Sequence, residues 1–540
     1  MAQLRVYDAF SDSAARTPPS DFLFTESVTA GVYGIAAGAV SWAEAAGRVE
    51  ALRAAYAAAG WGHGHRVGLL LENRPAFLYH WFALNALGVS VVPINAEMRS
   101  AELSYLIGHS EIGLAVTLPQ RAADLRAAAE LAGRALHTVE AEATEFPAPF
   151  EPAPRAGEPV GLQTECALLY TSGTTGRPKG CILTNDYFLR AGQWYAGLDD
   201  VCRYRRDAER VMTPLPLSHM NAMACSTMVV LVGGGCLVQL DRFHPKSWLQ
   251  SARESGATIV HYLGVMPAML LSAPPEAADR DHRIAWAFGA GVDRKNHAPF
   301  EQRFGFPLVE AWAMTETGAA ACIMANHAPR HVGTSCFGRC EDFVEVRMVD
   351  DDGADVPAGE PGELLVRSAG PDPRRYFFSG YLKDAKATDE AWAGGWFHTG
   401  DVVRRDAEGS LYFVDRKKNV IRRSGENISA VEVESVLNQH PAVAASAVAA
   451  TPDAVRGDEV MACIVLRAGR AADAATAQAI VQHALAQLAY YKAPGYVAFV
   501  DALPLTPSQK IQRGELRTLA QSLPGQAHCF DTRGMKKRQD

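Results

Sequence analysis

The 540-residue sequence predicts an α/β fold: a large N-terminal body of parallel-sheet α/β subdomains plus a small β-rich subdomain, followed by a small α+β C-terminal domain. Apolar segments of strand length alternate with helical patterns from Ser41 to Glu316, which is typical of parallel sheets covered on both faces. Short extended segments between Gly, Asp and Pro turns then continue to about Asp415. From Arg416 onward, strand and helix patterns alternate again.

The first elements are predicted by their caps and periodicity. Ser41 and Glu44 have the spacing of a capping box, which predicts a helix that runs to Ala59 and ends at Gly60. Residues 66–71 and 89–94 are predicted as buried strands, with an amphipathic helix over 77–87 between them. Prolines cluster between 147 and 159, which indicates a surface connector between subdomains.

The later elements follow from the same patterns. Residues 223–238 are the most membrane-like stretch, but they are shorter than the roughly 20 apolar residues of a span, so we predict a buried helix leading into a strand. Short strands are predicted at 344–349, 362–366 and 410–414, a helix at 431–437 and a strand at 459–466. We place one domain at 1–415, a second at 416–524, and a disordered polar tail at 525–540.

Composition narrows the partners and the compartment. The chain has 52 Lys and Arg against 60 Asp and Glu, a net charge of −8, whereas proteins that bind nucleic acid are normally basic. Ten cysteines without a CxxC pair indicate reduced thiols rather than disulfides or a zinc site. The N-terminus lacks the apolar core of a signal peptide. We therefore predict a cytoplasmic protein with no nucleic-acid partner and no transmembrane segment, its oligomeric state left open.

One glycine-rich segment carries the strongest chemical signal. Residues 170–180 read Tyr-Thr-Ser-Gly-Thr-Thr-Gly-Arg-Pro-Lys-Gly and follow an apolar strand pattern. Glycines allow close backbone approach, while hydroxyls and a lysine suit a polyphosphate. A Walker A loop is excluded, because Lys179 is followed by Gly180. The candidate phosphate-binding residues are Thr171, Ser172, Gly173, Thr174, Thr175 and Lys179.

This segment resembles the phosphate loop of the adenylate-forming superfamily, which includes acyl-CoA synthetases, luciferase-type enzymes and peptide-synthetase adenylation domains. Further motifs occur in the family's order, so the resemblance covers nearly the whole chain. They are Trp312-Ala-Met-Thr-Glu316, Trp396-Phe-His-Thr-Gly-Asp401, Tyr412-Phe-Val-Asp-Arg-Lys-Lys418, Ser424-Gly-Glu-Asn427 and Pro504-Leu-Thr-Pro-Ser-Gln-Lys510. Among the branches, the pattern looks most like the crotonobetaine/carnitine–CoA ligases.

The resemblance implies an AMP-forming acid–CoA ligase that uses ATP, Mg²⁺ and coenzyme A on a small carboxylic acid. The carboxylate attacks the α-phosphate, giving acyl-AMP and pyrophosphate, and a thiol then displaces AMP. The first step places negative charge on the triphosphate and needs cations and oriented donors there. Two alternatives stay open: an adenylation enzyme that loads a carrier-protein thiol, and a non-catalytic nucleotide-binding protein of the same fold.

The resemblance also implies roles at the nucleotide. These are Gly289 and Ala290 in a turn beside the nucleotide, Trp312 beside adenine, Asp401 and Arg416 at the ribose, Thr315 at the phosphates and Glu316 at the metal ion. A carboxylate suits two vicinal hydroxyl donors. The family usually has Tyr where this chain has Trp312, and the larger ring can still stack.

Three further matches concern the C-terminal domain. Lys510 matches the catalytic lysine that bridges the carboxylate and the α-phosphate, although Gln509 replaces the usual Gly before it. Lys418 falls at the hinge about which this mobile domain rotates between half-reactions. The loop with Arg422 and Gly425 would then face the pantetheine arm of CoA. Arg422 and Arg423 could contact CoA phosphates, and for Arg423 a solvated basic loop is an equal alternative.

The acyl site is implied only in outline. His219 matches a gating position near the substrate carboxylate, with a purely structural histidine as an equal alternative. Ala313 stands where Gly is usual, and its methyl group would shorten the pocket, which favours a short or medium acid. A carnitine-like acid would require aromatic or acidic walls. The aromatic candidates are Trp194, Tyr195, Tyr262, Trp286 and Trp312.

Overall fold

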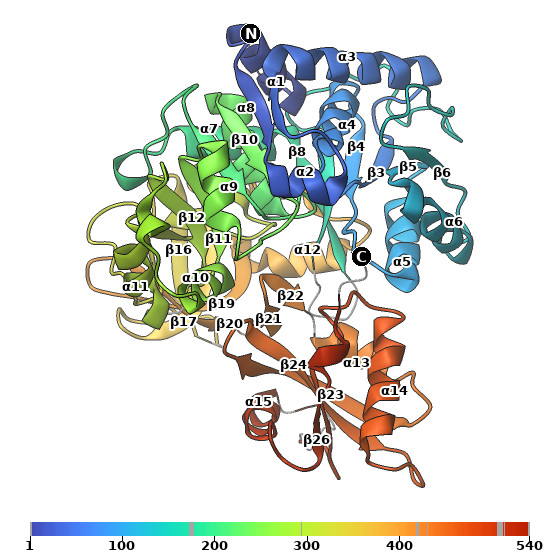
Figure 1. The fold of residues 1–540 in the computed structure, drawn as a ribbon, viewed down its shortest axis with the longest axis vertical. Coiled ribbons are helices and arrows are strands. Elements are labelled where there is room, and N and C mark those ends of the chain that lie inside the picture. The colour runs from blue at the N-terminus through green and yellow to red at the C-terminus, as the bar shows by residue number, and fades with distance from the viewer. Residues whose placement is uncertain are drawn as a thin grey trace. The chain divides into compact units, whose positions relative to one another are not determined.

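The computed structural model describes residues 3–171, 178–292, 294–350, 352–416, 421–428, 430–504, 511 and 513–537. The chain divides into two compact units, each described separately below (Figure 1). The first comprises Met1–Ala96, Ile107–Leu169 and Gly180–Asp415, and the second comprises Glu97–Leu106, Tyr170–Lys179 and Arg416–Asp540.

One sheet has the order β18-β8-β7-β4-β3-β5-β6. Its strands are β3 (Arg66–Leu70), β4 (Ser90–Pro93), β5 (Leu114–Thr117), β6 (His137–Glu140), β7 (Glu165–Thr171), β8 (Lys179–Thr184) and β18 (Gly380–Tyr381). The pairs β3–β4, β3–β5, β4–β7 and β5–β6 are parallel, and β18 joins β8 antiparallel. The inner strands β3, β4 and β5 are buried along nearly their whole length, as in a sheet that is covered on both faces.

A second sheet has the order β14-β13-β12-β11-β9-β10-β1-β2. Its strands are β1 (Asp21–Thr25), β2 (Gly38–Ser41), β9 (Arg210–Thr213), β10 (Cys236–Gln239), β11 (Ile259–Leu263), β12 (Trp286–Ala290), β13 (Leu308–Trp312) and β14 (Ile323–Met324). From β1 to β13 the neighbours are parallel. The carboxyl ends of β11, β12 and β13 therefore lie at one edge, where ligands bind in such sheets.

The β-rich part is a sheet in the order β15-β20-β19-β17-β16. Its strands are β15 (Cys336–Gly338), β16 (Val344–Val349), β17 (Pro361–Ser368), β19 (Phe397–Arg405) and β20 (Leu411–Arg416). Three of its pairings are antiparallel, β15–β20, β16–β17 and β17–β19. This sheet confirms the predicted small β-rich subdomain.

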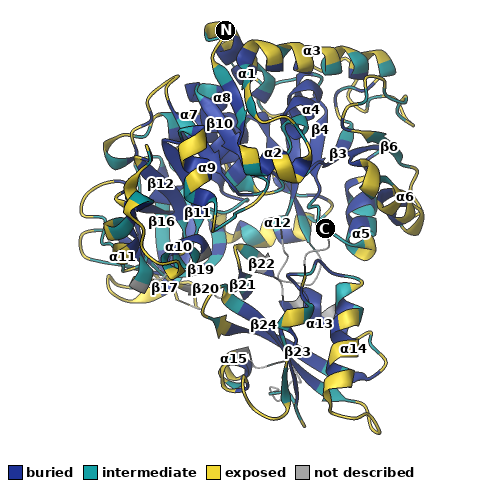
Figure 2. Ribbon diagram, viewed as in Figure 1, coloured by how far each residue is buried: buried dark blue, intermediate teal, exposed yellow. Residues whose placement is uncertain are grey.

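Helices surround the two large sheets, and Figure 2 shows the strands as mostly buried and the outer helices as partly exposed. The helices are α1 (Val6–Arg16), α2 (Ser27–Tyr33), α3 (Trp42–Ala59), α4 (Pro75–Ala86), α5 (Ser100–Ser110), α6 (Ala122–Leu131), α7 (Asn185–Ala196), α8 (Met228–Gly233), α9 (Trp248–Ser255), α10 (Val265–Ser272), α11 (Arg294–Phe304) and α12 (Ala385–Ala391). The predicted capping box is present, since Ser41 Oγ accepts from Glu44 N and the Glu44 carboxylate accepts from Ser41 N.

The apolar stretch 223–238 is a buried helical segment leading into a strand, as predicted. A π-helix, η3 (Asn221–Thr227), continues into α8, and β10 follows. None of the helices that the structure describes has the length and apolar character to cross a membrane.

The C-terminal part has an α+β fold built on one sheet, as predicted. Its path is β22-β21-β24-β25-β26, and β23 pairs with β24. The strands are β21 (Ile421–Arg423), β22 (Glu426–Ile428), β23 (Val443–Asp453), β24 (Gly457–Leu466), β25 (Tyr496–Phe499) and β26 (Cys529–Asp531), and the helices are α13 (Ala430–Leu437), α14 (Ala474–Leu485) and α15 (Arg513–Ser522). The prediction of a disordered tail is wrong for residues 525–537, because β26 pairs with β25 and Lys536 is buried.

Candidate functional site

The predicted phosphate loop lies between two adjacent strands. Thr171 ends β7 and Lys179 begins β8, and both residues are partly buried. The strand predicted before the loop is thereby confirmed. Ser172, Gly173, Thr174 and Thr175 lie outside the described residues, so their part in phosphate binding remains a prediction.

Trp312 and Asp401 are brought together across 89 positions of sequence. Trp312 ends β13 and Asp401 lies in β19, and both side chains are buried. The indole Nε1 donates to Asp401 Oδ2 at 2.9 Å, while Thr399 Oγ1 accepts from Asp401 N at 3.0 Å. The residues expected at adenine and at ribose therefore form one hydrogen-bonded pair.

Thr315 and Glu316 lie in the loop that follows β13 and are fixed by two phenols. Tyr187 donates to the Thr315 carbonyl and Tyr381 donates to Glu316 Oε1, each at 2.9 Å. Glu316 is buried, and burial together with this carboxylate raises the pKa of Tyr381 far above its usual value. Since β18 carries Tyr381 and pairs with β8, the Glu316 carboxylate is tied to the strand that follows the phosphate loop. A carboxylate oxygen held in a fixed orientation is a ligand that Mg²⁺ prefers.

Glu310 is a buried residue of β13 that organises the turn after β12. Its carboxylate accepts from Gly291 N at 3.0 Å, from Val292 N at 2.9 Å and from the Tyr262 hydroxyl at 3.2 Å. Burial raises its pKa, while the two backbone donors act in the opposite direction. At Gly289, a Cβ atom would lie 2.3 Å from the Tyr262 carbonyl oxygen, so this strand end requires glycine. Gly289 and Ala290 thus end β12 rather than lie in a turn, and Glu310 shapes the turn that follows Ala290.

Sequence reasoning missed Glu310, although one signal was available. A carboxylate in the middle of the apolar segment Leu-Val-Glu-Ala-Trp, residues 308–312, is costly to bury without donors. Such a residue predicts a specific set of partners in the fold.

We expect Glu310→Gln to lower kcat/KM for ATP in pyrophosphate exchange by about 10- to 100-fold. The amide offers only one acceptor oxygen to the two backbone N–H groups, and its NH₂ would face one of them. Glu209→Gln is the matched control, since Glu209 is also buried but pairs with Arg205 before β9. Both variants should have a lower melting temperature, but only Glu310→Gln should have a lower kcat/KM for ATP. An equal loss of kcat/KM for ATP in both variants would contradict a specific role of Glu310 at the nucleotide.

His219 is exposed, two residues before η3, and the buried imidazole that contacts the first residue of η3, Asn221, is His261. The His261 ring lies on β11, and burial lowers its pKa to about 3, so it is neutral at physiological pH. Nε2 lies 2.9 Å from the Tyr195 hydroxyl, and Nδ1 lies 2.7 Å from Asn221 Oδ1 and 3.0 Å from Ser226 Oγ. Sequence reasoning singled out His219 and missed His261 and Asn221.

One tautomer of His261 gives each buried group in this hydrogen-bond pattern a complementary partner. In this tautomer the buried Tyr195 hydroxyl donates to Nε2, which lies 2.9 Å away. Nδ1 must then carry the proton and donate to Asn221 Oδ1. The Asn221 side chain is only partly buried, and its NH₂ group has no partner among the residues described. The amide of Asn221 is thus held with its donors directed away from His261.

Two of the C-terminal candidates, Arg422 and Gly425, lie on a hairpin. Arg416 ends β20, and Lys418 and Lys510 lie outside the described residues. Arg422 lies in β21, and Ser424 and Gly425 form the two-residue turn to β22, both with positive φ as in a type I′ turn. The two expectations for Arg423 are both wrong, because its guanidinium is buried against Glu459.

Comparison with known proteins identifies the family. The model of the AMP-binding enzyme family matches residues 11–382, and that of its C-terminal domain matches residues 432–510. The crotonobetaine/carnitine–CoA ligase of Shigella flexneri is 31% identical over 468 residues, 84% of this chain and 88% of the relative. The sulfoacetate–CoA ligase of Cupriavidus necator is 32% identical over 469 residues, 85% and 89% of the two chains.

Solved structures share the fold. The o-succinylbenzoate CoA synthetase of Bacillus subtilis superposes with a TM-score of 0.80 at 24% identity, covering 96% of this chain and 98% of that one. The amide bond synthetase of Marinactinospora thermotolerans gives 0.79 at 25% identity, covering 96% and 99%. The predicted fold and superfamily are confirmed, and the chain is an enzyme of the acid–thiol ligase class. The motifs, the paired Trp312 and Asp401 and these matches together make the chain a member of the AMP-binding enzyme family.

Proposed function

We propose that the protein is an AMP-forming acid–CoA ligase of the cytoplasm that activates a small carboxylic acid with ATP. The hydrogen bond between Trp312 and Asp401 carries the proposal, because it joins the ring expected at adenine to a carboxylate that suits the ribose hydroxyls. In the first half-reaction a carboxylate oxygen bonds to the α-phosphorus and pyrophosphate leaves. In the second, the CoA sulfur bonds to the acyl carbon and AMP leaves.

The first half-reaction needs positive charge and donors at the α-phosphate. Thr171 to Thr175 and Lys179 would hold the triphosphate, and Lys510 would bridge the α-phosphate and the acid. Mg²⁺, held by Glu316 and phosphate oxygens, would neutralise part of the charge. Arg416 would support the ribose, and the hairpin with Arg422 and Gly425 would receive the pantetheine arm in the second half-reaction.

Three of the five aromatic candidates do not favour a quaternary-ammonium acid. Tyr195 stacks on His261 and on Trp286, with ring centroids 5.7 and 5.6 Å apart. Tyr195, Trp286 and Tyr262 are all at most 2% exposed, so their faces contact other core residues rather than a ligand. A cation–π site requires an accessible ring face. We therefore favour a different recognition chemistry for the acid.

Asn221 supplies that chemistry in the segment after His219. Its oriented NH₂ would donate to a hydroxyl, carbonyl, sulfonate or second carboxylate on the acid. Ala313, partly buried just beyond β13, would limit the length of the acid. The substrate class that follows is a short or medium acid with a hydrogen-bond acceptor.

We expect Asn221→Leu to lower kcat/KM by about 10- to 100-fold for acids with such an acceptor. For alkyl acids of equal length, kcat/KM should stay within a few-fold of the wild-type value. Leucine has a similar volume but no donor. Ser226→Ala is the control, since Ser226 contacts His261 from the same helix. Equal losses for both kinds of acid would remove Asn221 from the recognition of the substrate.

The test of the function is pyrophosphate release with ATP and Mg²⁺ over a panel of acids, betaines included. Thioester formation with free CoA is then compared with transfer to a holo carrier protein. Preference for the carrier protein would favour the carrier-loading alternative. No pyrophosphate release with any acid would favour a non-catalytic nucleotide-binding protein.

A further inference from the structure

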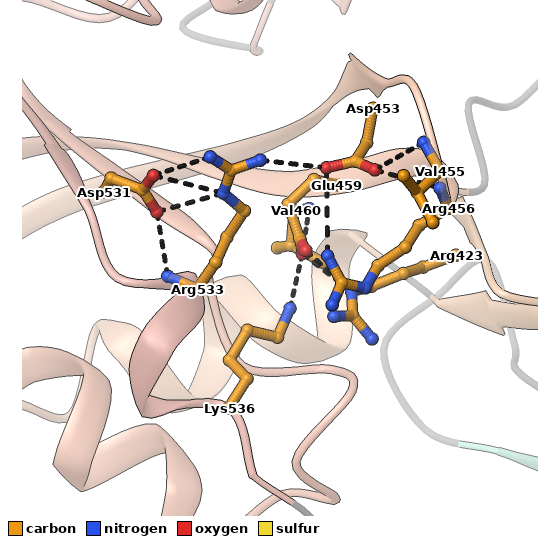
Figure 3. A network of polar contacts seen from close by, with 9 residues as sticks. All are labelled: Arg423, Asp453, Val455, Arg456, Glu459, Val460, Asp531, Arg533 and Lys536. Carbon is orange, nitrogen blue, oxygen red and sulfur yellow. Dashed lines mark hydrogen bonds and ion pairs between the residues drawn. The ribbon is translucent and has the colours of Figure 1, made fainter. Parts of the chain in front are cut away.

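A buried cluster of charges joins two strands of the terminal sheet to the C-terminal tail (Figure 3). Glu459, on β24, is completely buried and accepts from Arg423 Nε at 2.9 and 2.8 Å through its two oxygens. Lys536 Nζ, also completely buried, donates to the same carboxylate. Arg423 ends β21, and Lys536 follows the short helix η7 (Arg533–Met535). One carboxylate therefore connects the hairpin turn to the C-terminal tail.

The hairpin turn also rests on the turn between β23 and β24. Ser424 N donates to the Arg456 carbonyl at 2.9 Å, and Arg422 N donates to Asp458 Oδ2 at 3.1 Å. The Arg423 backbone pairs with Gly457. The position of the hairpin turn therefore follows that of residues 453–458.

The tail holds the turn 453–458 from its other side. Arg533 Nη1 donates to Asp453 Oδ2 at 3.1 Å, and its guanidinium pairs with Asp531 at 2.7 Å. Asp453 Oδ1 in turn accepts from Val455 N and Arg456 N at 3.0 and 2.9 Å (Figure 3). The tail is itself anchored by β26 and by Thr532 N, which donates to the Gly495 carbonyl at 2.9 Å.

The cluster is costly to bury, which makes it a geometric device rather than a simple source of stability. An arginine and a lysine share one carboxylate, and burial together with the Arg423 charge lowers the pKa of Lys536 to about 7. Apolar residues of similar volume often stabilise a core as well as buried ion pairs do. Directional hydrogen bonds, in contrast, fix the relative positions of the segments that they join.

We propose that the tail Cys529–Lys536 is a positioning element for the hairpin turn Ser424–Gly425, acting through Glu459 and Asp453. The inference rests on the proposed function, in which this turn receives the pantetheine arm during thioester formation. Lys536 and Arg533 touch neither nucleotide nor acid in this scheme. They set the position of backbone that the thiol must pass, and a misplacement of about 1 Å can cost 10²-fold in rate.

The experiment compares truncation after Thr532 with truncation after Lys537, which removes only residues beyond the cluster. Adenylation is measured by pyrophosphate exchange with the best acid of the panel, and thioester formation by single turnover of preformed acyl-AMP with CoA. We expect the shorter chain to form thioester about 10- to 100-fold more slowly and to adenylate within about twofold of wild type. The longer chain should match wild type in both steps.

A double variant guards against failure of the truncated chain to fold. Lys536→Met with Arg533→Met keeps the tail but removes both contacts, and Lys537→Met is its exposed control. We expect a selective loss of thioester formation, about tenfold, in the double variant alone. Equal loss of both half-reactions would indicate a merely structural tail and would overturn the proposal, as would two unaffected half-reactions. A wild-type enzyme that forms no thioester with CoA would instead overturn the proposed function, and the inference with it.

Discussion

Lys510→Ala is expected to slow adenylation by roughly 10²- to 10³-fold and to leave thioester formation from supplied acyl-AMP nearly unchanged. Two anions, the acid and the α-phosphate, approach each other in the first step, and charge increases on the phosphate oxygens as pyrophosphate leaves. A lysine ammonium at that point is a compact, mobile charge that interacts most strongly in the transition state. Thiol attack on acyl-AMP adds no charge to the triphosphate and does not need it.

The two half-reactions are measured separately, by pyrophosphate exchange and by the release of AMP from acyl-AMP with CoA. Gln509→Gly is the control, because it restores the residue usual in the family and leaves the charge in place. It should change adenylation by no more than a few-fold. If Lys510→Ala slowed both half-reactions equally, Lys510 would be a structural residue of its domain.

Features that neighbouring residues encode could be predicted from the sequence. The capping box at Ser41 and Glu44 involves residues three positions apart, and the strand before the phosphate loop is a continuous apolar run. The motifs that carry Trp312, Glu316 and Asp401 are likewise contiguous strings. Local propensity and pattern decide such features, so tertiary packing did not alter them.

Buried polar residues with distant partners could not be predicted. Glu310 binds backbone 18 and 19 positions away, and Glu459 binds Arg423 and Lys536 at separations of 36 and 77. Glu310 lies within an apolar strand and Glu459 directly before the apolar part of one, a pattern that indicates buried partners but not which residues they are. The tail was predicted as disordered for the same reason. Its charged residues make it polar as a sequence, but in the fold Arg533 pairs with Asp453 and Lys536 pairs with Glu459.

Asp401→Asn is expected to raise the KM for ATP and to lower kcat/KM by roughly 10- to 100-fold. Asp401 is buried, and its Oδ2 already accepts from Trp312 Nε1 at 2.9 Å. An amide oxygen can still accept from the indole, but the NH₂ group beside it would face ribose hydroxyls that need an acceptor. The variant therefore keeps the packing of this region and removes one acceptor at the ribose.

Trp312→Phe separates the two functions of the indole ring. The phenyl ring still stacks on a base, but it has no N–H to orient Asp401, so we expect a smaller loss of kcat/KM for ATP, about 5- to 10-fold. In a double-mutant cycle the two changes should be non-additive, because Asp401→Asn already disturbs the group that the indole orients. Fully additive losses would mean that Trp312 and Asp401 contact the nucleotide independently. The melting temperatures of the two single variants and of the double variant are the control for unfolding. A loss specific to the nucleotide should raise the KM for ATP and leave the melting temperature of the ligand-free protein nearly unchanged.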